Sequence, residues 1–115
     1  MDAIYIFIFG GIGSLLRFYL SKIPFNSDFP FMTFITNFLG AFMIGWISFH
    51  LTGKLNNQSL LLGLRVGLCG GFTTFSTFSL ESFSLLNTGH FLIAGSYMIL
   101  SIISCLLAIY LVYRI

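Results

Sequence analysis

The chain has 115 residues, of which 57% are hydrophobic and 7% are charged, and its mean hydropathy is +1.01. This composition is too apolar for a soluble domain of that length, so we expect one integral membrane domain over residues 1–115 and no soluble domain within it. A formal net charge of +2 is too small to indicate a nucleic-acid partner.

Four apolar segments are long enough to cross a hydrocarbon layer of about 30 Å, which takes about 20 helical residues. We therefore predict an all-α membrane protein with helices at about 4–20, 31–51, 60–86 and 91–113. The N-terminus lacks the basic region of a signal peptide, so the first segment is expected to stay as a helix.

The first predicted helix carries small and basic residues on one face. Gly10 and Ser14 lie four residues apart, which predicts close packing against another helix. Arg17 shares that face near the helix end and has two interpretations. Its side chain can extend to the lipid headgroups, or it can line an aqueous vestibule that attracts anions.

The second helix places a carboxamide, Asn37, at membrane depth on a stripe with Thr33 and Gly40. Such a group must find partners or face water. It can form a hydrogen bond that only joins two helices, or it can be a donor facing a conduction path. Ala41 and Gly45 add a second surface of small residues for packing.

The third apolar segment contains the run GLCGGFTTFSTFSLESF at residues 67–83. Lipid cannot hydrogen-bond the backbone that a glycine pair loosens, so hydroxyls and Gly70-Gly71 at membrane depth predict a helix interrupted near residues 70–76. The freed carbonyl and amide groups would be available to ions.

Two aromatic rings follow the predicted interruption. Phe75 and Phe78 lie three residues apart and project from one helix face. The positive edge of such a ring can meet an anion, although packing against lipid or core is the usual role of phenylalanine. Glu81 lies one turn further on and can be protonated, paired with a cation such as Arg17, or placed at a channel mouth; its role as an ion ligand or gate is a hypothesis.

On the fourth helix, Tyr97, Ser101 and Ser104 share a face, which is consistent with a polar track. Cys105 interrupts a longer run of hydroxyls on that side. Cys69 and Cys105 are the two cysteines of the chain, and both lie in apolar runs. Neither indicates a disulfide framework or a metal motif.

The distribution of positive charge does not favour one orientation in the membrane. Lys54, Arg65 and Arg114 fall on one side of the predicted spans, and Arg17 and Lys22 fall on the other. A difference of one charge should not fix one topology. We therefore expect insertion in both orientations and an antiparallel homodimer with dual topology.

Three blocks of sequence resemble a known family. They are GGIGSLLRF at residues 10–18, TFITNFLGAF at 33–42 and GLCGGFTTFSTF at 67–78. These blocks look like those of the Fluc/CrcB fluoride channels, and the resemblance covers essentially the whole chain. It implies a multi-pass protein of the cell inner membrane, embedded in the lipid bilayer, that exports fluoride passively through two pores in an antiparallel homodimer.

The resemblance also implies roles for individual residues. A structural sodium ion on the dimer axis would be held by the backbone carbonyls of Gly70 and Thr73. The residues implied for the fluoride pore or placed along it by the patterns above are Asn37, Phe75, Phe78, Ser76, Thr77, Ser101, Tyr97, Arg17 and Glu81.

Three other functions are weighed against a channel. A proton-coupled exporter of the small multidrug resistance type would need an embedded carboxylate in its first helix, which here has none beyond Asp2 at its start. A non-conducting structural subunit would explain the small packing surfaces but not the cluster of Thr, Ser and Phe. An enzyme is not expected, because no acid pair, His cluster or activated nucleophile occurs in a recognisable motif.

Overall fold

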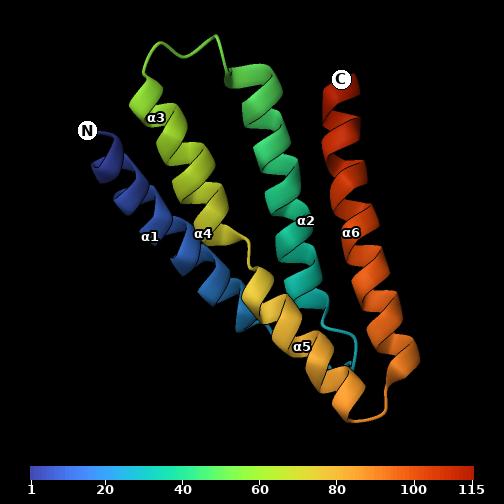
Figure 1. The fold of residues 1–115 in the computed structure, drawn as a ribbon. Coiled ribbons are helices and arrows are strands. Elements are labelled where there is room, and N and C mark those ends of the chain that lie inside the picture. The colour runs from blue at the N-terminus through green and yellow to red at the C-terminus, as the bar shows by residue number, and fades with distance from the viewer.

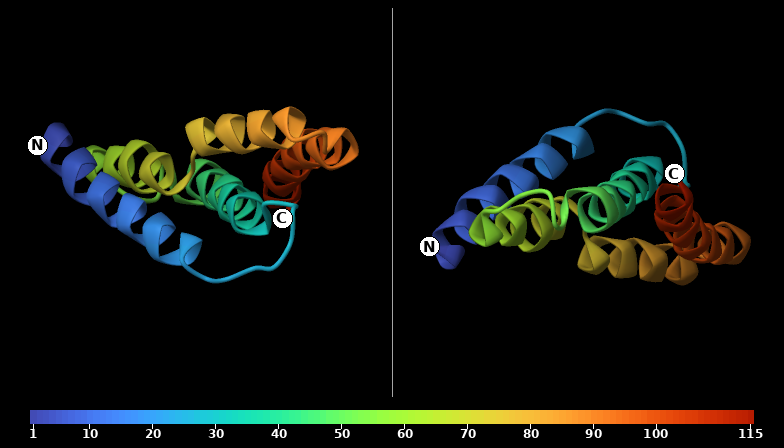
Figure 2. Two further views of the ribbon diagram at one scale, coloured as in Figure 1. Left: turned by 90° about the horizontal axis from the view of Figure 1, so that it is seen from below. Right: turned by 90° about the horizontal axis from the view of Figure 1, so that it is seen from above.

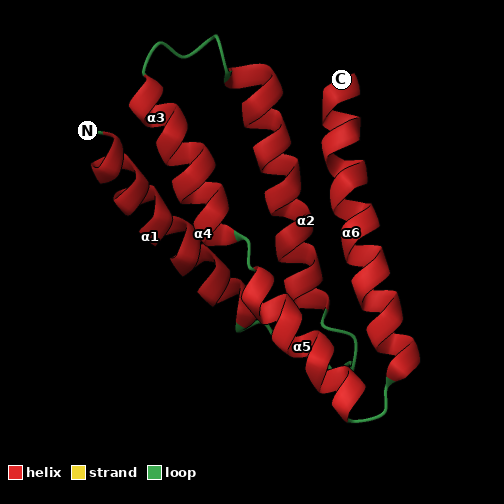
Figure 3. Ribbon diagram, viewed as in Figure 1, coloured by secondary structure: helices red, strands yellow, loops and turns green.

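The computed structural model describes residues 1–115, and its regular structure is entirely helical (Figure 3). The elements in chain order are α1 (Asp2–Ser21), α2 (Phe31–Trp46), η1 (Ile47–Leu51), α3 (Gln58–Leu62), η2 (Gly63–Cys69), α4 (Gly70–Phe72), α5 (Phe75–Asn87) and α6 (Phe91–Arg114). The two η segments are π-helical stretches that continue the helices before them.

Four helical stretches are long and apolar enough to cross a membrane. They are Asp2–Ser21, Phe31–Leu51, Gln58–Asn87 and Phe91–Arg114. This result confirms the prediction of an all-α protein with four helices able to span a membrane. The third span is the longest, with 30 residues, because it contains α3, η2, α4 and α5 in succession.

The four spans form two pairs that the third span connects. Figures 1 and 2 show α1 lying along α3, η2 and α4, while α2 lies beside α6. Helix α5 leaves the side of α1 and reaches the lower end of α6 (Figure 1). Both termini and the connector between α2 and α3 lie at one end of the bundle. The connectors between α1 and α2 and between α5 and α6 lie at the other end.

Helix α1 packs on the third span through backbone contacts that only glycine permits. A Cβ atom at Gly71 would lie 2.5 Å from the Gly10 carbonyl oxygen and 3.2 Å from Ser14 Oγ. A Cβ atom at Gly13 would collide with the Leu68 carbonyl oxygen. The face of α1 that carries Gly10 and Ser14 is therefore the packing face that the sequence predicts.

The bundle has little interior of its own. Only 18 of the 115 residues are buried, and the largest fully buried side chains are Tyr97 and Val112. Large apolar side chains along all four spans stay exposed. Because soluble monomers rarely expose so much contiguous apolar surface, this surface is available to lipid or to another protein chain.

Candidate functional site

The regular helix of the third span pauses at two threonines. Thr73 has an extended backbone with ψ 158°, and Thr74 follows with φ −148° and ψ 116°. Gly70, in contrast, has ordinary helical angles of φ −64° and ψ −40°. The pause thus falls just after the glycine pair, and Gly71 serves the close approach of α1 rather than a bend.

Threonine hydroxyls make this local structure. Thr74 is the N-cap of α5, because its Oγ1 accepts a hydrogen bond from the Thr77 backbone N–H at 3.2 Å. The Thr73 hydroxyl donates back to the Cys69 carbonyl oxygen at 2.9 Å. Such local bonds give the backbone an alternative to continuous helix, so the sequence TTFST ends one helix and begins another.

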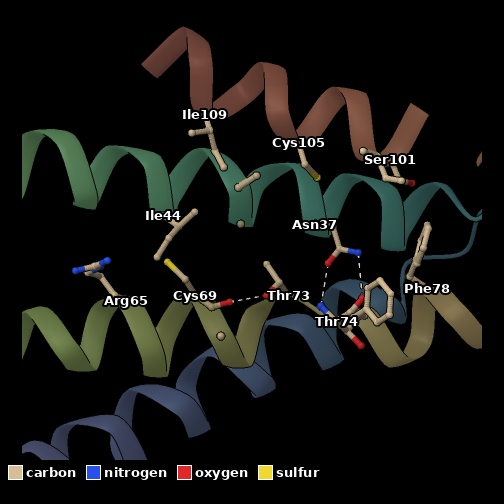
Figure 4. A pocket seen from close by; sticks show the side chains of 15 residues that line it. Asn37, Ile44, Arg65, Cys69, Thr73, Thr74, Phe78, Ser101, Cys105 and Ile109 are labelled. Carbon is tan, nitrogen blue, oxygen red and sulfur yellow. Dashed lines mark hydrogen bonds between the residues drawn. The ribbon is translucent and has the colours of Figure 1, made fainter. Parts of the chain in front are cut away.

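Asn37 on α2 holds the paused segment with two hydrogen bonds (Figure 4). Its Oδ1 accepts from the Thr74 backbone N–H at 2.9 Å, and its Nδ2 donates to the Thr74 carbonyl oxygen at 3.1 Å. The carboxamide therefore replaces backbone bonds that the helix lost. A carboxamide nitrogen carries two N–H donors, so one donor of Asn37 stays available beyond this contact.

Arg17 on α1 holds the same segment from the other side. Its Nε donates to the Gly71 carbonyl oxygen at 3.1 Å. In a continuous helix that oxygen would accept from the Phe75 N–H, which lies beyond the pause. The Arg17 side chain is thus part-buried and bonded to the third span.

Arg17 also lines a small polar cavity of about 40 Å³, which is roomy enough for a water-sized species. Thr36 is one of its lining residues and is buried, with 3% of its surface exposed. Apart from Met32, the remaining lining residues also carry hydroxyl groups: Ser21, Thr33, Thr74 and Thr77.

The two predicted rings lie next to each other on α5. The centroids of Phe75 and Phe78 are 5.6 Å apart. Phe78 also contacts the ring of Tyr97, with 5.1 Å between centroids, and is half-buried there. Phe75 has 79% of its surface exposed, so this chain covers little of its ring.

Glu81 has a hydroxyl partner within the chain. The Tyr97 hydroxyl donates to Glu81 Oε1 at 3.0 Å, and the Tyr97 side chain is fully buried. Of the roles considered for Glu81, an ion pair with Arg17 is not formed within one chain, since Arg17 contacts a carbonyl oxygen instead.

The predicted hydroxyls do not form one continuous row. Ser76 and Thr77 lie within hydrogen-bonding distance of Thr74 Oγ1, at 3.3 and 3.0 Å, and so surround the start of α5. Ser101 on α6 is buried, and its Oγ has no hydrogen-bond partner. An unpaired buried hydroxyl is unfavourable, so Ser101 is open to a partner that this chain does not supply.

A groove of about 480 Å³ connects these features (Figure 4). It lies between α2, α6 and the third span, and it contains Asn37 near Thr74 and Ser101 near Phe78. Cys69 and Cys105 are free thiols that line it as well. The other lining residues are Gly40, Ala41, Ile44, Arg65, Gly70, Thr73, Phe75, Ile102 and Ile109.

The carbonyl oxygens of Gly70 and Thr73 are open, because no backbone or side-chain hydrogen bond reaches them. The Thr74 and Thr77 N–H groups, which would serve them in a regular helix, are bound by Asn37 and by Thr74 Oγ1. Uncharged, unpaired oxygens are suitable ligands for a hard cation, so these two residues fit a sodium ion chemically.

Two residues of the site, Thr74 and Arg65, are not among the pore or metal residues predicted from the sequence. Thr74 could have been recognised as an N-cap, since threonine often stands directly before the first helical residue. No local pattern signals Arg65, because its position in the groove depends on how η2 lies relative to α2 in the folded chain.

Comparisons with known proteins agree with the resemblance in the sequence blocks. A family model described as "CrcB-like protein, Camphor Resistance (CrcB)" matches residues 4–113. A protein of Geotalea uraniireducens named "Fluoride-specific ion channel FluC" is 46% identical over 107 residues, covering 90% of this chain and 86% of that protein.

Two further relatives carry similar names. "Fluoride-specific ion channel FluC 1" of Staphylococcus epidermidis is 40% identical over 114 residues, covering 95% of this chain and 94% of the relative. "Fluoride-specific ion channel FluC" of Phocaeicola vulgatus is 42% identical over 108 residues, covering 90% and 88%. These names describe channels rather than enzymes. Because the family match spans nearly all residues, the chain belongs to the CrcB-like protein family.

Proposed function

We propose that this protein is a fluoride channel that lets fluoride leave the cell down its electrochemical gradient, as a multi-pass protein of the cell inner membrane. The observation that carries the proposal is the paused third span, which Asn37 holds beside the Phe75 and Phe78 rings in one groove. Hydroxyl and amide donors and positive ring edges can replace the water that a small anion loses.

The proposed path includes two donors that remain unpaired in this chain. Ser101 Oγ and the second N–H of Asn37 are free donors on the groove. Phe75 and Phe78 line the same groove, and the hydroxyls of Ser76 and Thr77 lie at the start of α5. Glu81 lies one turn beyond Phe78 and accepts from Tyr97 of α6, and this pair would mark the end of the path.

The working unit is proposed to be an antiparallel homodimer with two pores. Exposure of Phe75 at 79% supports this, because a ring that contacts a dehydrated ion needs cover from lipid and water. The charge distribution supports it too. Lys54 and Arg114 lie at the end of the bundle that holds the termini, and Lys22 lies at the other end, so the basic residues do not dictate one orientation (Figure 1).

The dimer is proposed to hold a structural sodium ion. Gly70 and Thr73 of each chain would provide two carbonyl oxygens, and a two-fold axis would bring four together. The bound cation would supply fixed positive charge at the interface. The residues of this chain would keep those oxygens available, because Asn37 and Thr74 Oγ1 occupy the N–H groups that would otherwise pair with them.

The first rival function needs a feature that this chain does not present. A proton-coupled exporter of the small multidrug resistance type would use a carboxylate inside its first helix. The acidic residue of α1 is Asp2, which stands at the helix start and accepts a hydrogen bond from Ser59 Oγ on α3. Asp2 therefore has a structural partner at the end of the bundle.

Fluoride efflux from liposomes that contain only this protein tests the proposal. The purified protein should release fluoride, measured with a fluoride electrode in the presence of a potassium ionophore, and should release chloride far more slowly. Phe75→Ile should abolish most fluoride release, because the ring edge is lost while the volume stays similar. Phe83→Ile is the matched control, since Phe83 lies on the same helix, is also exposed and does not line the groove.

Three results would contradict the proposal. One is the absence of fluoride efflux from vesicles that contain folded protein. Another is equal release of fluoride and chloride. The third is an equal loss of activity in the Phe75 and Phe83 variants, which would remove the specific role of the ring in the groove.

A further inference from the structure

The groove contains one charged side chain, Arg65, at the end opposite Ser101 and Phe78 (Figure 4). Arg65 belongs to η2, within the third membrane-spanning stretch. No hydrogen bond or ion pair of this chain reaches its guanidinium group, whereas Arg17 is bound to a carbonyl oxygen. An unpaired arginine within a span is unfavourable in lipid and usually faces a water-filled cavity or a substrate path.

The chemistry of the groove suits an anion beside this cation. No carboxylate lines the groove. Its free donors are Ser101 Oγ, which is buried and unpartnered, and the second N–H of Asn37. Its open acceptors, the carbonyls of Gly70 and Thr73, are the oxygens assigned above to sodium. A positive charge at one end and hydrogen-bond donors further along are therefore available to a negative ion.

We propose that Arg65 captures anions for the groove: it attracts fluoride to one end and so raises the rate at which fluoride reaches Asn37 and Ser101. This inference rests on the proposed function and adds a residue that sets the rate of entry. Clefts with charge of one sign raise the local concentration of oppositely charged ions and their association rates by 10-fold or more.

Salt separates capture by charge from a structural role. The electrostatic reach of a charge exposed to water falls from about 30 Å at 0.01 M to about 3 Å at 1 M ionic strength. A capture residue should therefore matter most in dilute salt. A residue that only stabilises the fold or the dimer should matter equally at both salt concentrations.

The experiment measures initial fluoride efflux from liposomes at about 0.01 M and about 1 M ionic strength, adjusted with an impermeant salt. We expect Arg65→Gln to slow efflux roughly 10-fold in dilute salt and to differ from wild type by less than about twofold in concentrated salt. Arg65→Lys, which keeps the charge, should retain most of the rate. Lys54→Gln removes the same charge from the connector between α2 and α3 and should behave like wild type.

Other results would overturn the inference. Arg65→Gln and Lys54→Gln could both conduct like wild type, which would remove Arg65 from the entry step while leaving the fluoride channel intact. Arg65→Gln could lose activity equally at both salt concentrations and dissociate the dimer in cross-linking experiments, which would assign Arg65 to the interface. If the wild-type protein carries no fluoride, the proposed function fails and this inference fails with it.

Discussion

The two halves of the third span differ in how closely other helices of the same chain pack against them. The first half, α3 to α4, lies along α1 and approaches it through glycine contacts. The second half, α5, packs mainly on α6 and leaves Phe75, Leu80 and Phe83 exposed. The face of the first half that meets α1 is therefore fully packed within the monomer. The second half presents side chains whose cover must come from elsewhere.

The first half should be the more sensitive to added volume. Gly13→Leu should prevent correct packing of α1 on the third span, because even a Cβ atom there meets the Leu68 carbonyl oxygen. Overpacking a tight contact costs about 1–3 kcal/mol or more, and a backbone contact cannot yield as a side chain can. We expect loss of monodisperse protein in size-exclusion chromatography.

Gly11→Leu is the matched control for Gly13→Leu. Nothing lies within 4 Å of a Cβ atom at Gly11, so this variant should elute and melt like wild type. Equal behaviour of the two variants would mean that α1 does not approach the third span as closely as described.

The junction of the two halves should be the next most sensitive region. Asn37→Leu leaves the Thr74 N–H and carbonyl without partners, and each unsatisfied group costs about 1–3 kcal/mol. We expect a lower melting temperature and faster hydrogen exchange in peptides that contain Thr74. Asn56→Leu in the exposed connector is the control, and protection that persists in Asn37→Leu would show that the junction does not need α2.

The second half should show the smallest effect, because one side-chain hydrogen bond joins it to α6. Tyr97→Phe removes the bond to Glu81 and should destabilise the protein by about 0.5–1.5 kcal/mol, the net contribution of a typical hydrogen bond. Thermal melting measures this change. Tyr110→Phe is the control on the same helix, since its ring is exposed, and an equal effect of both variants would contradict the role of the Glu81 bond.

The apolar runs of the sequence were enough to predict the helices. The expected second span at residues 31–51 coincides with α2 and η1 together, because about 20 consecutive apolar residues admit few alternatives to a helix in a membrane. The packing face formed by Gly10 and Ser14 could also be predicted, since helical spacing alone places the two residues together.

The details of the junction were less predictable. The glycine pair suggested the bend, yet Gly70 is helical and the extended residues are Thr73 and Thr74, which fall within the predicted range of 70–76. Gly71 is required by the close approach of α1, which depends on tertiary packing, whereas nothing lies within 4 Å of a Cβ atom at Gly70. The partner of Asn37, the Thr74 backbone, could not be predicted either. It depends on the depth and rotation of α2 relative to the third span.

The positions in the sequence of the two side chains that hold the interrupted third span have a consequence for biosynthesis. Arg17 and Asn37 both precede the segment that they hold. When residues 70–75 leave the ribosome, the side chains that stabilise their irregular backbone have already been made, and proteins fold from the N-terminus during synthesis. A circular permutant that begins at the third span would be made with its unpaired peptide groups first and should insert less efficiently.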